Sequence, residues 1–209
     1  MREPLDTRED VLAAFDVSRE TTERLDAILE TLDDWRTRVN LIGPREWPVI
    51  WSRHVADSLQ LADLVGAPSD LVDLGSGAGF PGLVLAAALG DNTKVTLIES
   101  VGKKCAFLRA ASETAGLNVQ VTQSRIEAAP VSPAEIVTAR ALSALPKLLE
   151  YAAPWTENGA ICVFPKGESA EEELTLARRA WSFHVESVPS RTSPTGRILK
   201  LSEVRRCET

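Results

Sequence analysis

Hydrophobic and polar positions divide the chain into two parts with different periodicity. Up to Pro68, apolar residues recur at intervals of three and four, which is the spacing of one helix face. Ser18 suits an N-cap, so we predict an amphipathic helix over residues 19–39 and a second helix over residues 47–65. Residues 1–68 are therefore expected to form a helical extension.

From residue 69 to residue 209, short β-branched or apolar runs alternate with helical stretches. Strands are predicted over residues 71–76, 94–100, 119–124, 135–141 and 160–166. The helices predicted between them cover residues 81–89, 103–116 and 144–155. This alternation indicates one α/β domain with a mostly parallel sheet and helices on both faces. Two last strands, at 181–190 and 196–204, have no helix between them and predict an antiparallel C-terminal hairpin, which makes seven strands.

Composition narrows the class of protein. A chain of 209 residues that is 44% hydrophobic can bury one sizeable core. No apolar run reaches membrane-spanning length, and the first residues lack the pattern of a secretory signal, so we expect a cytoplasmic protein without a membrane span. The widely spaced Cys105, Cys162 and Cys207 predict neither a disulfide framework nor a metal site.

The net charge of −7 is unevenly distributed along the chain. The first 34 residues carry 11 acidic residues against four arginines, which accounts for the whole imbalance. The remaining chain is neutral. A nucleic-acid partner, which a negative total charge would disfavour, thus stays compatible with a basic face on that part.

The run DLVDLGSGAGFPGLVLAAAL, residues 70–89, breaks into glycines directly after a predicted strand. In an open parallel sheet, ligands bind beyond the carboxyl ends of the strands. Gly75, Gly77 and Gly79 can adopt positive φ and allow a ligand to approach the backbone closely. We interpret this glycine turn as a ligand site, with a purely structural turn as the alternative.

The residues around the glycine turn distinguish between two ligands. Gly77, Gly79 and Gly82 spell the GxGxxG of dinucleotide sites, followed by Glu99. Asp73, at the end of the strand, would repel a pyrophosphate but attract an ammonium group. S-Adenosylmethionine has an ammonium group and no phosphate, so Asp73 would bind that group and Glu99 the ribose hydroxyls. We predict the Rossmann-like fold of S-adenosylmethionine-dependent methyltransferases, with a nicotinamide oxidoreductase as the weaker alternative.

An ordered set of segments resembles the bacterial small-subunit ribosomal RNA methyltransferase G family, also called glucose-inhibited division protein B. The segments are RVNLIG (38–43), RHVADSL (53–59), VDLGSGAGFPGLVLA (72–86), LIESVGKKCAFLR (97–109), QSRIE (123–127), TARAL (138–142) and PKG (165–167). Together they extend through nearly the whole chain. The resemblance implies S-adenosylmethionine as cofactor and methylation of guanine N7 in 16S ribosomal RNA. The partner would be that RNA or the small ribosomal subunit, and we expect a monomer that needs no metal.

The resemblance also implies further cofactor contacts, at Gly75, Phe80, Ile126, Glu127 and Arg140. Ile126 would pack on the adenine, and the backbone or carboxylate of Glu127 would accept from its exocyclic amine. Arg140 has no neutralising neighbour in the sequence and would meet the methionine carboxylate or the RNA.

Guanine N7 carries a free lone pair, so its methylation requires no removal of a proton. We therefore expect no general base and predict that catalysis depends on positioning and exclusion of water, with Arg140 and Lys166 as candidates. His54 is expected to be a packing or surface residue paired with Asp57 or Ser58. TARAL stands where amine methyltransferases commonly carry a [DNS]PP[YFW] motif, which disfavours that chemistry.

Cations in loops or at helix starts are the candidates for RNA contact. Lys166 would donate to guanine O6 without blocking N7. The full set is Arg53, Lys103, Lys104, Arg125, Arg140 and Lys166. Each could equally be a solvated surface charge. The alternative function is a cofactor sensor or a small-molecule methyltransferase without an RNA substrate.

Overall fold

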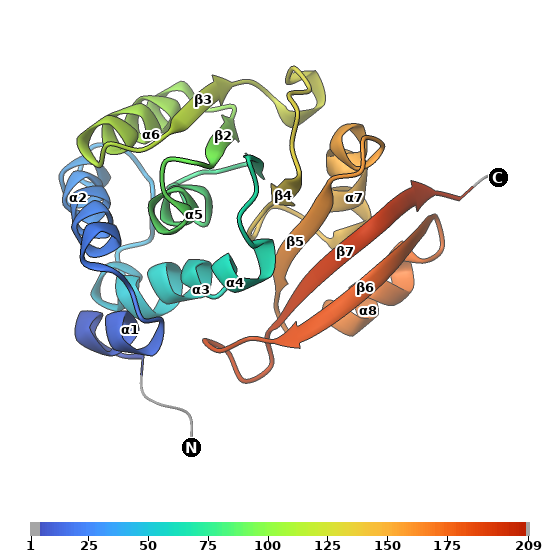
Figure 1. Ribbon diagram of the computed structural model, residues 1–209, viewed down its shortest axis with the longest axis horizontal. Coiled ribbons are helices and arrows are strands. Elements are labelled where there is room, and N and C mark those ends of the chain that lie inside the picture. Colours follow the sequence, from blue (N-terminus) through green and yellow to red (C-terminus); the bar gives the residue numbers. More distant parts are fainter. Residues whose placement is uncertain (1–4, 208–209) are drawn as a thin grey trace.

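The computed structural model describes residues 5–207, which form three layers with helices on both faces of one sheet (Figure 1). The strands are β1 Asp70–Leu74, β2 Lys94–Glu99, β3 Val119–Gln123, β4 Ile136–Thr138, β5 Ile161–Lys166, β6 Trp181–Pro189 and β7 Arg197–Arg206. The α-helices are α1 Arg8–Ala14, α2 Arg19–Arg36, α3 Ala56–Leu59, α4 Ala62–Val65, α5 Gly82–Leu89, α6 Gly102–Thr114, α7 Leu145–Thr156 and α8 Ala170–Ala177. Shorter helical segments are η1 Trp47–Val49, η2 Trp51–Val55 and η3 Ile126–Ala128. Within residues 5–207, no helix combines the length and the apolarity needed to cross a membrane.

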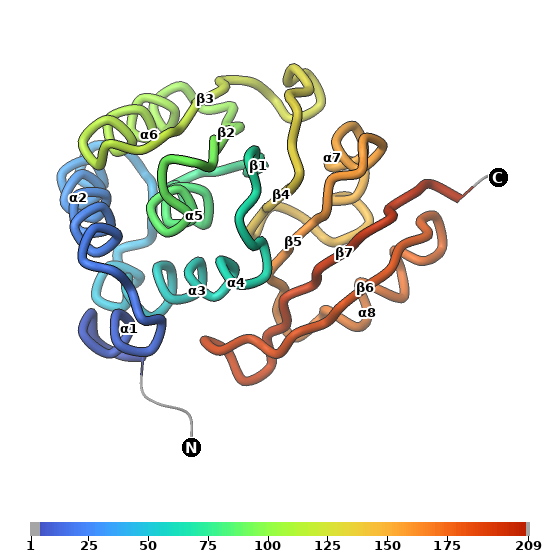
Figure 2. The backbone as a smooth tube through the Cα atoms, viewed as in Figure 1, coloured from blue at the N-terminus to red at the C-terminus, as the bar shows by residue number. Residues whose placement is uncertain are grey.

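The strands of the sheet lie in the order β3-β2-β1-β4-β5-β7-β6. The first five strands in the chain pair in parallel, and β7 pairs antiparallel with both β5 and β6. The chain path in Figure 2 shows β7 lying between these two strands. The prediction of a seven-stranded, mostly parallel sheet with an antiparallel hairpin is confirmed. The direction of the connections reverses between β1 and β4, which is where open α/β sheets bind ligands.

Two apolar clusters separate the three layers. Successive side chains of a strand point to opposite faces, so Leu71 joins the cluster beneath α2, α5 and α6, whereas Val72 joins the cluster beneath α7 and α8. Both side chains are fully buried. Burial on both faces is typical of parallel strands. Polar side chains are therefore accommodated mainly at the ends of the strands.

The N-terminal helices share the first of these clusters with the sheet. Leu25, Ile28 and Leu32 of α2 are buried in it together with Leu83 of α5. The predicted N-cap is present, because the Ser18 hydroxyl accepts from the backbone N–H of Thr21 at 3.1 Å. The helix predicted to extend to residue 39 ends at Arg36, since the carbonyl of Trp35 accepts from both Arg38 and Val39 and closes the last turn.

The prediction of one continuous helix over residues 47–65 is wrong. The segment is a 3-10 turn, a π-helical turn and two single α-helical turns. A π-helical turn inserts one residue and changes the face to which the following side chains point. This change matters for the site, because His54 lies in the turn and Asp57 lies two residues after its end.

Three further elements differ from the prediction. Strand β4 has three residues rather than seven, because Ala141 adopts a φ of 51° and breaks the extended backbone. Helices α1 and α8 were not predicted, because their seven and eight residues are too short for a clear helical period. Their local signals are the capping box of Thr7 with Asp10 and the acidic first turn of α8.

Candidate active site

The glycine turn follows β1 at the point where the strand order reverses. Gly75, Gly77 and Gly79 all adopt positive φ, at 67°, 56° and 85°. A Cβ on Gly75 would lie 2.7 Å from a terminal methyl group of Leu142, whereas one on Gly79 would lie 2.3 Å from Leu83 and within 3.2 Å of its Cβ, so packing restricts Gly79 more strongly than Gly75. A Cβ on Gly77 would meet nothing closer than the carbonyl oxygen of Gly75, at 3.7 Å. Of the three, Gly77 is therefore the position with room for a ligand.

Gly82, at the start of α5, is also required for packing. A Cβ there would lie 2.3 Å from Leu97 and 2.8 Å from Oδ2 of Asp73. Helix α5 consequently lies directly against β1 and β2. In a dinucleotide fingerprint the second glycine leaves room for the pyrophosphate and the third packs the helix on the strand. Gly82 has this packing role, but Gly79 at the second position is packed against Leu83, which disfavours a dinucleotide.

Glu99 ends β2 and stabilises the glycine turn from the neighbouring strand. Its side chain is buried, and Oε2 accepts from the backbone N–H of Gly77 at 3.0 Å. Its Oε1 accepts from the backbone N–H of Val101 at 2.8 Å, beside the start of α6. A carboxylate has about four lone-pair sites, so Glu99 retains acceptor capacity for the predicted ribose hydroxyls.

Asp73 lies fully buried beneath the glycine turn. Its Oδ1 accepts from the Thr138 hydroxyl at 2.8 Å, whereas Oδ2 has no hydrogen-bond partner among residues 5–207. Burial raises the pKa of Asp73 to about 6, although hydrogen bonds oppose the rise. An unpaired buried carboxylate oxygen is costly, and a cationic donor would satisfy it. This oxygen is the feature that fits the ammonium group of S-adenosylmethionine.

Phe80, at the end of the glycine turn, is buried and lies close to both His54 and Arg140. The rings of His54 and Phe80 are 4.9 Å apart, and the guanidinium of Arg140 lies 5.5 Å from the Phe80 centroid. Arg140 donates to Nδ1 of His54, so the proton of the neutral imidazole is on Nε2. Burial lowers the pKa of His54 to about 4, which keeps the ring neutral at pH 7. The predicted packing role of His54 is confirmed by its burial, but the predicted pairing with Asp57 or Ser58 is wrong for the side chain, whose partner is Arg140. The Ser58 hydroxyl donates to the backbone carbonyl of His54 instead.

Arg140 has no neutralising neighbour in the sequence, but the fold supplies a carboxylate. Its Nη1 donates to Oδ2 of Asp57 and to the backbone carbonyl of Arg53, both at 3.2 Å. Asp57 lies 83 positions earlier in the chain, so only the folded sheet and helical layer bring the two residues together. Arg140 is consequently held at the end of β4 by the segment that precedes β1.

Lys166, which was expected to donate to guanine O6, is also paired within the protein. Its side chain is 8% exposed, and Nζ lies 2.8 Å from Oε2 of Glu173 and donates to the carbonyl of Ser143 at 2.8 Å. Burial opposes ionisation of Glu173, but hydrogen bonds from Lys166 and Ser169 prevail and lower its pKa. Two of the three Nζ–H donors are therefore used, which leaves one for guanine O6. Glu173 belongs to α8, a helix that the sequence analysis misses.

A groove of about 1150 Å³ lies over the carboxyl ends of β4 and β5. Three of the cations predicted to contact RNA line it, namely Arg53, Arg140 and Lys166. The groove is also lined by residues 141–144 and by most of the β6–β7 loop, which comprises residues 190–196. The sequence does not indicate that this loop borders the site, and it gives Asp57 only as an expected partner of His54.

The remaining predicted residues lie outside this groove. Gly75, Gly77 and Glu99 belong to the glycine turn and its support, and Ile126 packs on the apolar cluster beneath α7 and α8. Lys103, Arg125 and Glu127 are exposed, and Lys104 is half-buried. The structure thus places the predicted cofactor residues and the groove side by side, joined by Phe80 and Arg140.

Solved structures with the same fold are methyltransferases. The O-methyltransferase from Bacillus cereus in complex with SAH has a TM-score of 0.57 at 16% identity, covering 85% of this chain and 91% of that chain. A SAM-dependent methyltransferase from Aquifex aeolicus has a TM-score of 0.59 at 17% identity, covering 78% and 95%. The fold is therefore the Rossmann-like fold of S-adenosylmethionine-dependent methyltransferases.

Sequence relatives define the family within that class. The family profile described as rRNA small subunit methyltransferase G matches residues 21–198. A protein of Hyphomonas neptunium named ribosomal RNA small subunit methyltransferase G is 60% identical over 203 residues, which is 96% of this chain and 97% of the relative. A protein of the same name from Gluconobacter oxydans is 48% identical over 190 residues, covering 91% and 97%. The chain belongs to the rRNA small subunit methyltransferase G family.

Proposed function

We propose that this protein transfers a methyl group from S-adenosylmethionine to N7 of a guanine in 16S ribosomal RNA. Family membership over residues 21–198 supports an RNA of the small subunit as substrate. The observation that carries the cofactor assignment is the buried Oδ2 of Asp73, which lacks a hydrogen-bond partner within residues 5–207 and lies beside Gly82, at the start of the helix that follows the glycine turn. We further propose a monomer that acts in the cytoplasm, where ribosomes occur, and needs no metal.

The residues of the glycine turn and its support would hold the cofactor. Asp73 would accept from the ammonium group, and Glu99 would accept from the ribose hydroxyls while it keeps the turn in place. The remaining proposed contacts are Gly75, Gly77, Phe80, Ile126, Glu127 and Arg140. The bound cofactor supplies an electrophilic methyl group on a sulfonium.

The groove beside that site would hold the target guanine. N7 needs no deprotonation, so the groove residues contribute orientation and exclusion of water rather than base catalysis. His54 and Arg140 agree with this requirement: the pKa of about 4 makes His54 a weak base whose Nδ1 already accepts from Arg140, and Arg140 is a cation. Arg53, Lys103, Lys104, Arg125 and Lys166 complete the proposed RNA contacts.

The proposal is tested with purified protein, labelled S-adenosylmethionine and 16S ribosomal RNA or small subunits from cells that lack the gene. We expect one labelled guanine, identified by chain cleavage at 7-methylguanine. A transcript made with 7-deazaguanine keeps the base-pairing edge but lacks N7, so it should accept no label. Label in that transcript, or only in protein or small molecules, would reject the proposal.

A cofactor sensor is separated from the enzyme by binding measurements. The enzyme should bind RNA with an affinity that falls as salt rises, because phosphate contacts release counterions. A sensor would bind the cofactor in calorimetry and show no such RNA binding.

A further inference from the structure

One carboxylate, that of Asp57, joins two walls of the groove. On one side, Oδ2 accepts from Nη1 of Arg140 at 3.2 Å. On the other side, Oδ1 accepts from the Thr192 hydroxyl and from Nε2 of Gln60, both at 2.8 Å. Arg140 follows β4 and Thr192 lies in the β6–β7 loop, so Asp57 connects segments that are distant in the sequence.

The β6–β7 loop is attached to the helical layer by the same group of side chains. Oε1 of the buried Gln60 accepts from the backbone N–H of Arg191 at 2.8 Å and from the Ser190 hydroxyl at 3.3 Å. The Ser190 oxygen in turn accepts from the backbone N–H of Thr192 at 3.2 Å. The loop therefore depends on Asp57 and Gln60 for its position.

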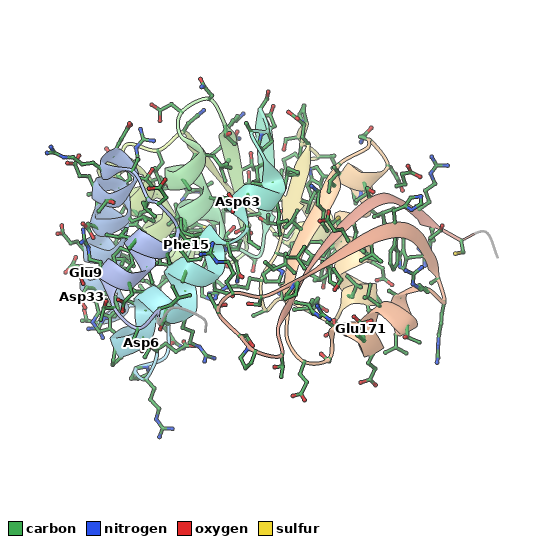
Figure 3. All side chains as sticks on the ribbon, turned by 60° about the horizontal axis from the view of Figure 1, so that its bottom comes forward. Asp6, Glu9, Phe15, Asp33, Asp63 and Glu171 are labelled. Atoms are coloured by element: carbon green, nitrogen blue, oxygen red, sulfur yellow. The ribbon has the colours of Figure 1, made fainter. Side chains whose placement is uncertain are left out.

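A second attachment connects this loop to the N-terminal helix α1. The guanidinium of Arg191 donates to the carbonyl of Ala14 at 2.6 Å. The same guanidinium lies 3.9 Å from the ring centroid of Phe15, which is labelled in Figure 3. The loop is thus attached at both Gln60 and α1, and Asp57 is the part of this arrangement that also reaches Arg140.

We propose that Asp57 is a positioning residue for the reaction stated above: it holds Arg140 and the β6–β7 loop at the separation that admits the RNA substrate. This inference rests on the proposed function. Three donors, from Gln60, Thr192 and Arg140, converge on the two carboxylate oxygens. Asparagine would offer one oxygen and one NH₂ group, so Asp57→Asn must set a donor against a donor on one of the two sides.

The sign of the effect distinguishes positioning from simple charge. Asp57→Asn removes a negative charge from the groove, so a purely electrostatic role predicts tighter RNA binding. A positioning role predicts weaker RNA binding, because the β6–β7 loop and Arg140 both lose the carboxylate that connects them. We expect KM for RNA to rise on the order of tenfold, with kcat and the Kd of S-adenosylmethionine changed by less than about twofold.

Asp63→Asn is the matched control. Asp63 is an exposed residue of α4, labelled in Figure 3, and its replacement removes the same charge outside the groove. This variant should keep the wild-type KM. A role of Asp57 in folding alone would lower the active fraction and hence kcat, leaving KM unchanged, and that result would refute the proposal.

A second readout requires no methylation. Hydrogen exchange should accelerate in residues 190–196 of Asp57→Asn and remain unchanged in Asp63→Asn. Thr192→Val removes the loop contact while Arg140 stays paired, so it should accelerate the same exchange and raise KM less, even if Asp57→Asn does not fold. Unchanged exchange in residues 190–196, or a lower KM, would overturn the role of Asp57. Failure of the wild-type protein to methylate RNA would instead overturn the proposed function.

Discussion

Replacing Asp73 with Asn tests the charge state of the carboxylate beneath the glycine turn. The variant keeps the size of the side chain and removes its ability to ionise. Burial raises the pKa of Asp73 from 3.8 to about 6, so the folded protein binds this proton more tightly than the unfolded chain does. The stability that protonation contributes is therefore fully present below pH 3.8 and is lost as the pH rises through about 6.

The magnitude follows from the two pKa values. At about 1.36 kcal/mol per pH unit, the interval from 3.8 to about 6 corresponds to up to about 3 kcal/mol. The Asp73→Asn variant does not titrate at this position. The free energy of unfolding of the variant minus that of the wild-type protein should therefore increase by up to about 3 kcal/mol as the pH rises from about 4 to about 7.

Urea unfolding followed by tryptophan fluorescence at several pH values measures this difference, with Asp63→Asn as the exposed control. Calorimetry with S-adenosylmethionine gives a second readout. Binding of the ammonium group requires the ionised carboxylate, so the affinity of the wild-type protein should fall as the pH falls through about 6, and that of the variant should not. A stability difference that is independent of pH would show that burial does not raise the pKa of Asp73.

The glycine turn supplies a paired prediction: Gly77→Ala should chiefly weaken cofactor binding, with a strain of about 1–2 kcal/mol, whereas Gly79→Ala adds a contact of 2.3 Å with Leu83 and should lose more stability. Calorimetry and urea unfolding of both variants would contradict this if their effects were equal. Glu173→Gln leaves Lys166 buried without its counter-charge and should reduce stability by about 1–2 kcal/mol, and Glu171→Gln on the exposed side of α8 is the control in the same unfolding assay. With a thiol reagent, exposed Cys207 should react in the folded protein, while burial raises the pKa of Cys162 and Cys105 and should delay their reaction until unfolding; rapid modification of Cys162 would contradict its burial.

The sequence predicts the sheet well because its strands carry unambiguous local signals. β-Branched runs separated by helical stretches define the parallel strands, and the absence of a helical pattern before residue 196 predicts the hairpin. The glycine turn is equally visible. The sequence does not show which of its glycines pack against side chains and which leave room for a ligand, because the contacts at Gly75, Gly79 and Gly82 are with leucine side chains from other elements.

The partners of the charged residues could not be predicted for the same reason. Arg140 is paired with a carboxylate 83 positions away, and the orientation of Asp57 depends on a π-helical turn that has no periodic signal of its own. Lys166 is paired with a residue of α8, a helix of eight residues. Long-range pairing and short elements thus account for the errors at the site.

The place of β7 in the sheet has a consequence for the order in which the protein is made. β6 precedes β7 in the chain, yet β7 lies between β5 and β6. During synthesis, β6 therefore has no neighbour with which to pair until residues 197–206 leave the ribosome, and β5 keeps an open backbone edge until then. A nascent chain paused before residue 197 would expose that edge beside the apolar residues of β5, so this is the stage of translation at which we expect chaperone binding and misassembly to concentrate.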